Sequence, residues 1–560
     1  MAEENSVFIY TEGVVVPEDV VRVRVHPSVT IIPEKAFSDC NNLVEVELCD
    51  GLVEIGKEAF KNCEALKQMS IPSTVTKIHS YSFQYCDALE TIELYDGLLE
   101  IGKQAFDHCI SLKSISIPST VNFIGDRAFY ETQILSISLP DGVQNIEEFA
   151  LCRTQVLKFR LPPLITSIPS GLFSVCTYML SLELSENIED IEIISFNLTC
   201  SLRNLAIPLD ANFPAFPSNV FSDCIDLEQL FGSVPNIINA LKHRFDGLPI
   251  HKMLYYQSYN NMTVDQLNNA TNVKISRSRS KPDPTSNLQD SLGMTPLHIM
   301  ACSTKQDLDL YRILIDKYPE TLVTEDSWGA IPLLYALWGD APSEIVWYLV
   351  ESYQSLYPNH ELNWTEMVKT LAKDAPLKVI QRLLDVQNES FPEQIIDWDH
   401  VIDELIAIDS NRTTSREIKK PLSSEKNFRY LVKYSMAGRI SAIGLRQWRD
   451  DITNEIETTK VAFRSFRATI QSKISEYEAS YQELKEAATM IELVLWKNKI
   501  SEARKVINEE GGSRKKMKLD ESAIREQCRS RCGANIVIEN VLPYLLPGSS
   551  NSEENNLPVQ

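Results

Sequence analysis

A short pattern repeats along residues 32–230, and its period constrains what the chain can fold into. Isoleucine recurs every 23 residues from Ile32 to Ile124, and phenylalanine recurs with the same spacing from Phe37 to Phe129. Cysteine keeps the same period, at Cys40, Cys63, Cys86 and Cys109. Because self-similarity at a fixed period of roughly 20–30 residues is typical of stacked supersecondary units, the sequence predicts a solenoid.

Each repeat ends in a segment in which apolar and polar residues alternate. In the run LKSISI, Leu112, Ile115 and Ile117 are apolar, and the alternation at the end of the run has the period of a β-strand. One such strand cannot bury its apolar row alone, but stacked copies bury a continuous core. Proline follows the strand in several copies, where it removes a hydrogen-bond donor and turns the chain, at Pro72, Pro118, Pro140 and Pro208.

The consensus I-G-x-x-A-F-x-x-C-x-x-L-x-x-I-x-I-P resembles the BspA-type leucine-rich repeats of bacteria and unicellular eukaryotes. The resemblance covers about 200 of the 560 residues and weakens along the chain. Thr132 and Thr154 stand near the cysteine position, and Leu151 replaces the phenylalanine. Some relatives of this type are cell-surface or adhesive proteins, so the resemblance also implies that alternative.

Polar residues lie between the apolar residues of each expected strand and should form a strip along one face of the sheet. The strip is mildly acidic at first, rich in hydroxyl groups in the middle, and basic near its end. Solenoids bind partners on extended surfaces of this kind. A merely solvated face is the alternative, because no aromatic residue stands in the strip. The candidate partner-binding residues are Glu45, Glu47, Gln68, Ser70, Thr91, Glu93, Ser114, Ser116, Ser136, Ser138, Lys158, Arg160, Ser181 and Glu183.

Twelve cysteines invite a disulfide or metal interpretation, but most of them occupy the repeat position. There we interpret them as small buried residues that line a turn, since free cysteine is among the most buried residue types. Cys528 and Cys532 form a separate pair with no histidine nearby, which makes a poor zinc site. We therefore expect no metal site and no cofactor.

A second kind of repeat begins near residue 290, where DSLGMTPLHIMACST resembles the ankyrin signature. Thr295 can cap a helix whose first residue is Pro296. Gly329 lies 36 residues after Gly293, close to the ankyrin period of about 33, although the second copy has lost the threonine and the histidine. By the same resemblance, His298 should form hydrogen bonds within the turn and should not act as a ligand or catalyst.

Beyond residue 452 the apolar residues follow a heptad-like spacing, which predicts a long helix. This helix either forms a coiled coil, which would make the chain a homo-oligomer, or packs back on the chain. A basic cluster follows it and is a candidate nuclear localisation signal, although cations also suit the end of a helix. The cluster consists of Arg514, Lys515, Lys516 and Lys518.

The predicted fold class is α+β and multidomain. A β-rich leucine-rich-repeat solenoid comes first, followed by an all-α ankyrin-like helical array and a long C-terminal helix. The expected divisions are an N-terminal cap at 1–31, the leucine-rich repeats at 32–232, a connector and linker at 233–289, the ankyrin-like repeats at 290–410, a linker at 411–447, the long helix at 448–510, and the basic cluster and tail at 511–560.

Charge and motif content limit the functions to consider. A net charge of −23 argues against a surface for nucleic acid or anionic lipid. No stretch of about 18 apolar residues predicts a membrane span, and the first residues do not resemble a signal peptide. The phosphate-binding loops, zinc-protease motif, serine-hydrolase motif and kinase motifs are absent from the sequence.

We therefore predict a non-enzymatic scaffold that binds other proteins, whose identity is unknown, through its repeat surfaces. We expect a cytoplasmic location, with the nucleus as an alternative. Two other functions stay open at this point: a cell-surface or adhesive leucine-rich repeat protein, and a nuclear regulatory adaptor.

Overall fold

The computed structural model describes residues 7–213, 219–277, 289–412, 423–435, 453, 456, 468–476 and 478–479. The chain divides into two compact units, Met1–Ile396 and Asp397–Gln560, and each is considered by itself. Most of the expected long helix, the basic cluster and the pair Cys528/Cys532 lie outside the described residues. The expectations for those segments stay predictions.

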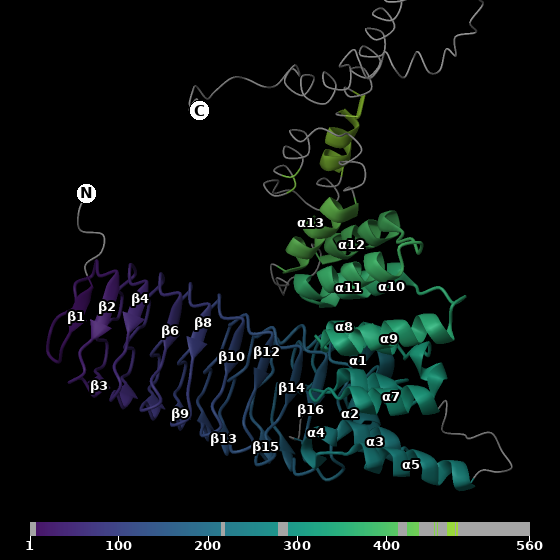
Figure 1. Cartoon of the computed structure of the whole chain (residues 1–560), viewed down its shortest axis with the longest axis horizontal. Helices are drawn as coiled ribbons and strands as arrows, with labels where there is room; N and C mark the ends of the chain where they lie inside the picture. The colour runs from purple at the N-terminus through teal and green to yellow at the C-terminus, as the bar shows by residue number, and fades with distance from the viewer. Residues whose placement is uncertain are drawn as a thin grey trace, which may run out of the picture. The chain divides into compact units, whose positions relative to one another are not determined.

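The first part of the chain is a solenoid built from short parallel strands in two columns (Figure 1). One column contains the strands that the alternating pattern predicted. Its members are β1 (Phe8–Tyr10), β2 (Arg22–Val25), β4 (Glu45–Glu47), β6 (Gln68–Ser70), β8 (Thr91–Glu93), β10 (Ser114–Ser116), β12 (Ser136–Ser138), β14 (Lys158–Arg160) and β16 (Ser181–Glu183). Neighbours pair one repeat apart, so that Met69 lies beside Ile92 and Ile115 lies beside Ile137. This register stacks the apolar side chains into one continuous row.

The second column consists of two-residue strands that end at the repeated isoleucines. Its members are β3 (Ile31–Ile32), β5 (Glu54–Ile55), β7 (Lys77–Ile78), β9 (Glu100–Ile101), β11 (Phe123–Ile124), β13 (Asn145–Ile146), β15 (Ser167–Ile168) and β17 (Asp190–Ile191). Strands β3 to β13 form one six-stranded sheet in which Ile32, Ile55 and Ile78 are in register. Two residues are too few to show alternation. The isoleucine period therefore indicated that these positions repeat, but it did not predict that they form a sheet.

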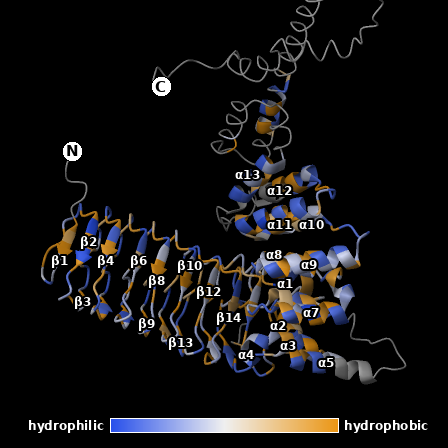
Figure 2. Ribbon diagram, viewed as in Figure 1, coloured by the Kyte–Doolittle hydropathy of each residue, from blue (hydrophilic) through white to orange (hydrophobic). Residues whose placement is uncertain are grey.

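Between the two columns lies a core of stacked rings. The phenylalanines of successive repeats are fully buried, and their ring centroids are 5.0 Å apart for Phe37 and Phe60 and 5.3 Å apart for Phe60 and Phe83. Hydrophobic and hydrophilic residues alternate along the whole solenoid in Figure 2, because every repeat contributes to this core.

The cysteines line the turn next to these rings, as predicted. The thiol of Cys63 donates to the carbonyl oxygen of Phe37 at 3.2 Å, and that of Cys86 donates to Phe60 at 3.1 Å. All ten cysteines of the described segments are free and buried. Burial raises the pKa of the Cys176 thiol to about 11. The Cys176 thiol is therefore protonated at neutral pH and a poor nucleophile, and it donates a hydrogen bond to the carbonyl oxygen of Leu151 in the preceding repeat at 3.1 Å.

Each turn of the solenoid uses non-glycine residues in the left-handed region. Tyr81 and Tyr85 have φ values of 62° and 59°, and their amides donate to carbonyl oxygens of the next repeat, Lys103 at 2.8 Å and Asp107 at 2.9 Å. This conformation is unfavourable for residues with a Cβ. Hydrogen bonds between repeats offset that cost, so the turn is stable only when a neighbouring repeat is present.

Helices follow the last strands of the solenoid within the same compact unit. They are α1 (Ile225–Phe231), α2 (Val234–Lys242), α3 (Pro249–Tyr255), α4 (Gln257–Asn260), α5 (Val264–Arg277), α6 (Pro296–Cys302), α7 (Leu308–Lys317), the 3-10 helix η2 (Pro319–Leu322), α8 (Pro332–Trp338), α9 (Ser343–Leu356), α10 (Trp364–Asp374) and α11 (Leu377–Ser390). Contacts join α6 to α7, α8 to α9, and α10 to α11, so the later helices pack as successive pairs.

The first two pairs begin with the same turn. The side chain of Asp290 accepts from the amides of Leu292 and Met294, and the side chain of Asp326, 36 residues later, holds an equivalent turn. His298 Nδ1 lies 2.8 Å from Thr295 Oγ1, and its Nε2 lies 2.9 Å from the carbonyl oxygen of Ala330 in the next pair. His298 is thus buried and hydrogen-bonded within the turns, in the role that the sequence predicted.

The second unit contains α12 (Trp398–Arg412) and α13 (Ser423–Ser435), which contact each other. The rings of Trp398 and Tyr434 lie 5.4 Å apart, and Val401 and Leu431 are buried. Within this unit α12 packs against α13, the helix that follows it. The expected grouping of residues 397–410 with the preceding helices stays a prediction.

Replacing Gly102 by alanine should destabilise the solenoid by about 1–3 kcal/mol, because backbone atoms of the preceding repeat lie 2.8 Å from where its Cβ would be. Gly142→Ala is the matched control, since the nearest atom to its Cβ would be 3.7 Å away. Thermal unfolding monitored by circular dichroism measures both variants. Equal losses in the two variants would contradict the steric explanation.

Candidate partner-binding surface

The first ten predicted strip residues, from Glu45 to Ser138, all lie exposed on one face of the first strand column. Strands β4, β6, β8, β10 and β12 each have an exposed, buried, exposed pattern. The central apolar residue of each strand points into the core, as Ile92 and Ile115 do. Successive side chains of a strand point to opposite faces, so the strip follows directly from the alternation in the sequence.

The N-terminal end of the strip is held by cross-strand ion pairs. Arg22 pairs with Glu45 at 3.4 Å, and Arg24 pairs with Glu47 on the same two strands. The hydrogen bond from Arg24 lowers the pKa of the Glu47 carboxyl. Because all four side chains are well exposed, these pairs add little stability. They do neutralise the acidic start of the strip.

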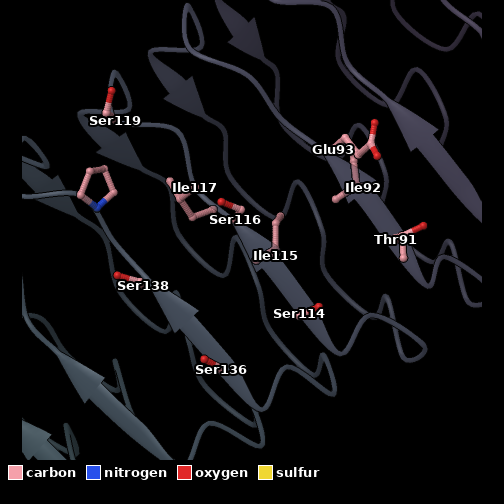
Figure 3. A pocket seen from close by; sticks show the side chains of 11 residues that line it. Thr91, Ile92, Glu93, Ser114, Ile115, Ser116, Ile117, Ser119, Ser136 and Ser138 are labelled. Atoms are coloured by element: carbon pink, nitrogen blue, oxygen red, sulfur yellow. The ribbon is translucent and has the colours of Figure 1, made fainter. Parts of the chain in front are cut away.

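The middle of the strip is hollowed. A depression of about 660 Å³ lies over β8, β10 and β12 (Figure 3). The residues that line it are Thr91, Ile92, Glu93, Ser114, Ile115, Ser116, Ile117, Ser119, Ser136, Ser138 and Pro140. Glu93 is the one charged residue among them, and it accepts a hydrogen bond from the hydroxyl of Tyr95 at 3.0 Å.

Three of the last four predicted residues, Lys158, Arg160 and Glu183, contact the chain's own helical segment. Lys158 Nζ donates to the carbonyl oxygens of Ala301 at 2.7 Å and Ser303 at 3.2 Å, at the C-terminal end of α6. A cation suits that end of a helix, where carbonyl groups lack partners within the helix. Burial lowers the pKa of Lys158 to about 8. Gly339 packs against the same side chain, since a Cβ there would lie 1.8 Å from Lys158 Cε.

Glu183 is the second polar anchor of this contact and is almost completely buried. Its carboxylate accepts from the Ser303 hydroxyl at 3.0 Å and from the amide and hydroxyl of Thr304 at 2.7 and 2.8 Å. Lys158 and Glu183 therefore bind the same segment: Lys158 donates to its carbonyl groups, and Glu183 accepts from its amide and hydroxyl groups.

Arg160 and Ser181 lie close to these anchors, at the junction between the end of the solenoid and the helical segment. Arg160 stacks on the ring of Tyr259 at 4.3 Å and pairs with Asp141 at 2.5 Å. The buried Ser181 accepts a hydrogen bond from Asn204 at 2.8 Å. The open part of the strip consequently ends at β12. No pattern in the sequence could indicate this, because the contacts of Lys158 and Glu183 join residues more than a hundred positions apart.

Helices α3 and α4 fasten the same junction through two tyrosines. The Tyr255 hydroxyl donates to the carbonyl oxygen of Leu182 at 2.7 Å and accepts from the amides of Leu184 and Ala206. Burial raises the pKa of Tyr255 to about 12. The Tyr259 hydroxyl lies 2.8 Å from the carbonyl oxygen of Glu183. The segment predicted as a connector at 233–289 thus contains helices that dock on the sheet.

Two buried arginines complete the junction. Arg244 pairs with Asp290 at 2.7 Å, both side chains being fully buried, and it also donates to Asn204 at 2.8 Å. Arg203 pairs with Asp226 at 2.5 Å and lies between two tryptophan rings of the helical array, each 5.1 Å away, Trp328 and Trp338. The last repeat and the first helix pairs are therefore joined by charged groups removed from water.

Neither a metal site nor a membrane span is present in the described parts of the chain. Those parts contain no cluster of three or more His, Cys, Asp or Glu side chains placed to hold a metal ion. None of their helices has the length and apolar character needed to cross a membrane.

The solenoid matches a known family of repeats. Residues 19–132 and 99–228 match the family described as the BspA type leucine rich repeat region, with six copies of the repeat. The segment from 19 to 228 is thus a BspA-type leucine-rich repeat region, as its resemblance implied. This family is defined by a repeat and indicates no catalytic activity. No curated protein matches the chain.

Several solved structures are similar to the solenoid. A leucine-rich repeat protein from Bacteroides ovatus is 31% identical over 30% of this chain and 44% of that one, with a TM-score of 0.29. The T. pallidum leucine rich repeat protein is 23% identical over 35% and 82%, with a TM-score of 0.26. A leucine rich cell surface protein from Faecalibacterium prausnitzii is 22% identical over 37% and 77%, with a TM-score of 0.23. This chain spans less than half of the Bacteroides ovatus protein.

Gly339→Ala should cost about 1.5–3 kcal/mol, because the new methyl group would push Lys158 away from the carbonyl groups that it binds. In a Lys158→Ala background, the same change should cost less than about 0.5 kcal/mol, since the colliding atoms are gone. Urea unfolding of the four proteins of this cycle measures the coupling. Additive losses would show that Lys158 does not dock there.

Proposed function

We propose that this chain is a non-enzymatic protein-interaction scaffold that binds another protein on the open part of its strip, from Glu45 to Ser138. The observation that carries the proposal is the junction at Lys158 and Glu183. There, the same face of the same strand column already holds a polypeptide, the chain's own helical segment.

The contacts at the junction show how side chains on this face of the strands can bind a polypeptide. Side chains of the two outward rows bind the end of a helix and the loop that follows it, using one cation and one carboxylate. Strands β4 to β12 present equivalent rows at the same register, and the outward side chains of these rows are exposed in the first unit. Extended solenoid faces of this kind suit macromolecular partners.

The helix pairs from α6 to α11 form a second part of the proposal. We assign them to an ankyrin-like array, supported by the equivalent turns at Asp290 and Asp326 and by the bond from His298 to the following pair. Such arrays offer a repeated surface, so this region would provide a further contact for a partner.

The proposed location is the cytoplasm, with the nucleus as an alternative that depends on residues 514–518. The cell surface stays a separate alternative, since one similar structure is that of a leucine rich cell surface protein. Immunofluorescence before and after permeabilisation tests this. Signal that requires permeabilisation is the expected result, and labelling of intact cells would favour the surface protein.

A photo-reactive phenylalanine derivative at position 116 should form covalent adducts with another protein when cells expressing the chain are irradiated. Position 145 is the matched control, because Asn145 is exposed on β13 of the other sheet. Mass spectrometry of the adducts identifies the partner. Equal labelling from both positions, or none from position 116, would count against binding on the strip.

A further inference from the structure

The hollow over β8, β10 and β12 has a composition that selects one class of partner. We propose that it holds an extended segment of the bound protein, with a lysine or arginine side chain of that segment placed on Glu93. This inference rests on the proposed function and names the chemistry that the strip recognises.

The size of the hollow fits a short extended peptide. Its walls come from three neighbouring strands, which at a spacing of about 4.8 Å span about 10 Å. An extended chain covers that span with about three residues at about 3.3 Å each. The wall side chains are small, so a peptide backbone can approach the sheet closely.

The hydroxyl groups match the hydrogen-bonding needs of such a backbone. Ser114 and Ser136 stand side by side in one row, and Ser116 and Ser138 stand side by side in the other (Figure 3). Within the described residues, no protein group forms a hydrogen bond with these four hydroxyls. Each hydroxyl can donate and accept, so the two rows can pair with both amides and carbonyls of an extended chain.

The charge around the hollow indicates which kind of side chain a bound segment would place on Glu93. Glu93 has the Tyr95 hydroxyl as a hydrogen-bond partner and no cation within the described part of the chain. Two cations further along the same face, Arg160 and Lys158, are engaged elsewhere, since Arg160 pairs with Asp141 and Lys158 binds the helical segment. Asp96 adds a second carboxylate beside the rim, where it accepts from Ser119. The two carboxylates make this edge of the hollow acidic, which favours a basic side chain there.

Selection from a phage-displayed library of random twelve-residue peptides on the full-length chain tests the inference. The expected peptides carry lysine or arginine, and fluorescence anisotropy should give at least a tenfold loss of affinity for Glu93→Lys. Glu189→Lys is the matched control, with the same charge change at an exposed residue beside β17, and should alter affinity less than twofold. A peptide with glutamate in place of its basic residue should recover binding to Glu93→Lys.

Two further measurements separate the possible failures. If the selection yields no basic peptide, or if Glu93→Lys leaves affinity unchanged, the inference is wrong. In either case the selected peptides are tested on Ser116→Trp, a variant whose new side chain fills the hollow. If this variant no longer binds them, the strip remains the binding surface. If it still binds them, the proposed function fails as well. Neutral oligosaccharides serve as a parallel probe, and binding that Ser116→Trp abolishes would reassign the hollow to carbohydrate.

Discussion

The ion pair between Arg244 and Asp290 connects the two halves of the first unit, and much of the surrounding structure depends on it. Both side chains are fully buried, and Asp290 also holds the turn that starts the first helix pair. Leaving one partner of such a pair alone costs about 3–5 kcal/mol, whereas the intact pair adds little net stability. We infer that its contribution is to specificity: the helices can dock on the last repeat in only one arrangement that satisfies both charges.

That arrangement sets the extent of the proposed binding surface. Because the helices dock where they do, Lys158 and Glu183 are used within the chain, while the serine rows of β10 and β12 remain open. The strip, whose charge already varies along the sequence, therefore has three parts in the structure: a neutralised start, an open hydroxyl-rich middle and an occupied end. The open middle adjoins strands that carry the helices, so a partner bound there would lie close to residues that fix the junction.

Local patterns predicted the part of this structure that depends on local physics. Alternation around Ile115 was enough to predict a strand and to predict that the adjacent residues point to the outer face of the sheet. The cysteine period predicted buried thiols. The second sheet was missed because two-residue strands carry no periodicity of their own. The junction was missed for another reason: Lys158 meets Ala301 only through tertiary structure, and a lysine bound to a helix end looks in sequence like any exposed lysine.

The constant register between repeats has a consequence for how such a chain can change. Both ends of the solenoid are specialised, the first by its arginine strand β2 and the last by the docked helices, whereas the central repeats contact only copies of themselves. Duplication of one 23-residue unit inside the array would preserve every contact at the two ends and lengthen the open face by one strand spacing, about 4.8 Å. The length of the recognised segment can thus evolve in fixed steps, independently of the region that anchors it.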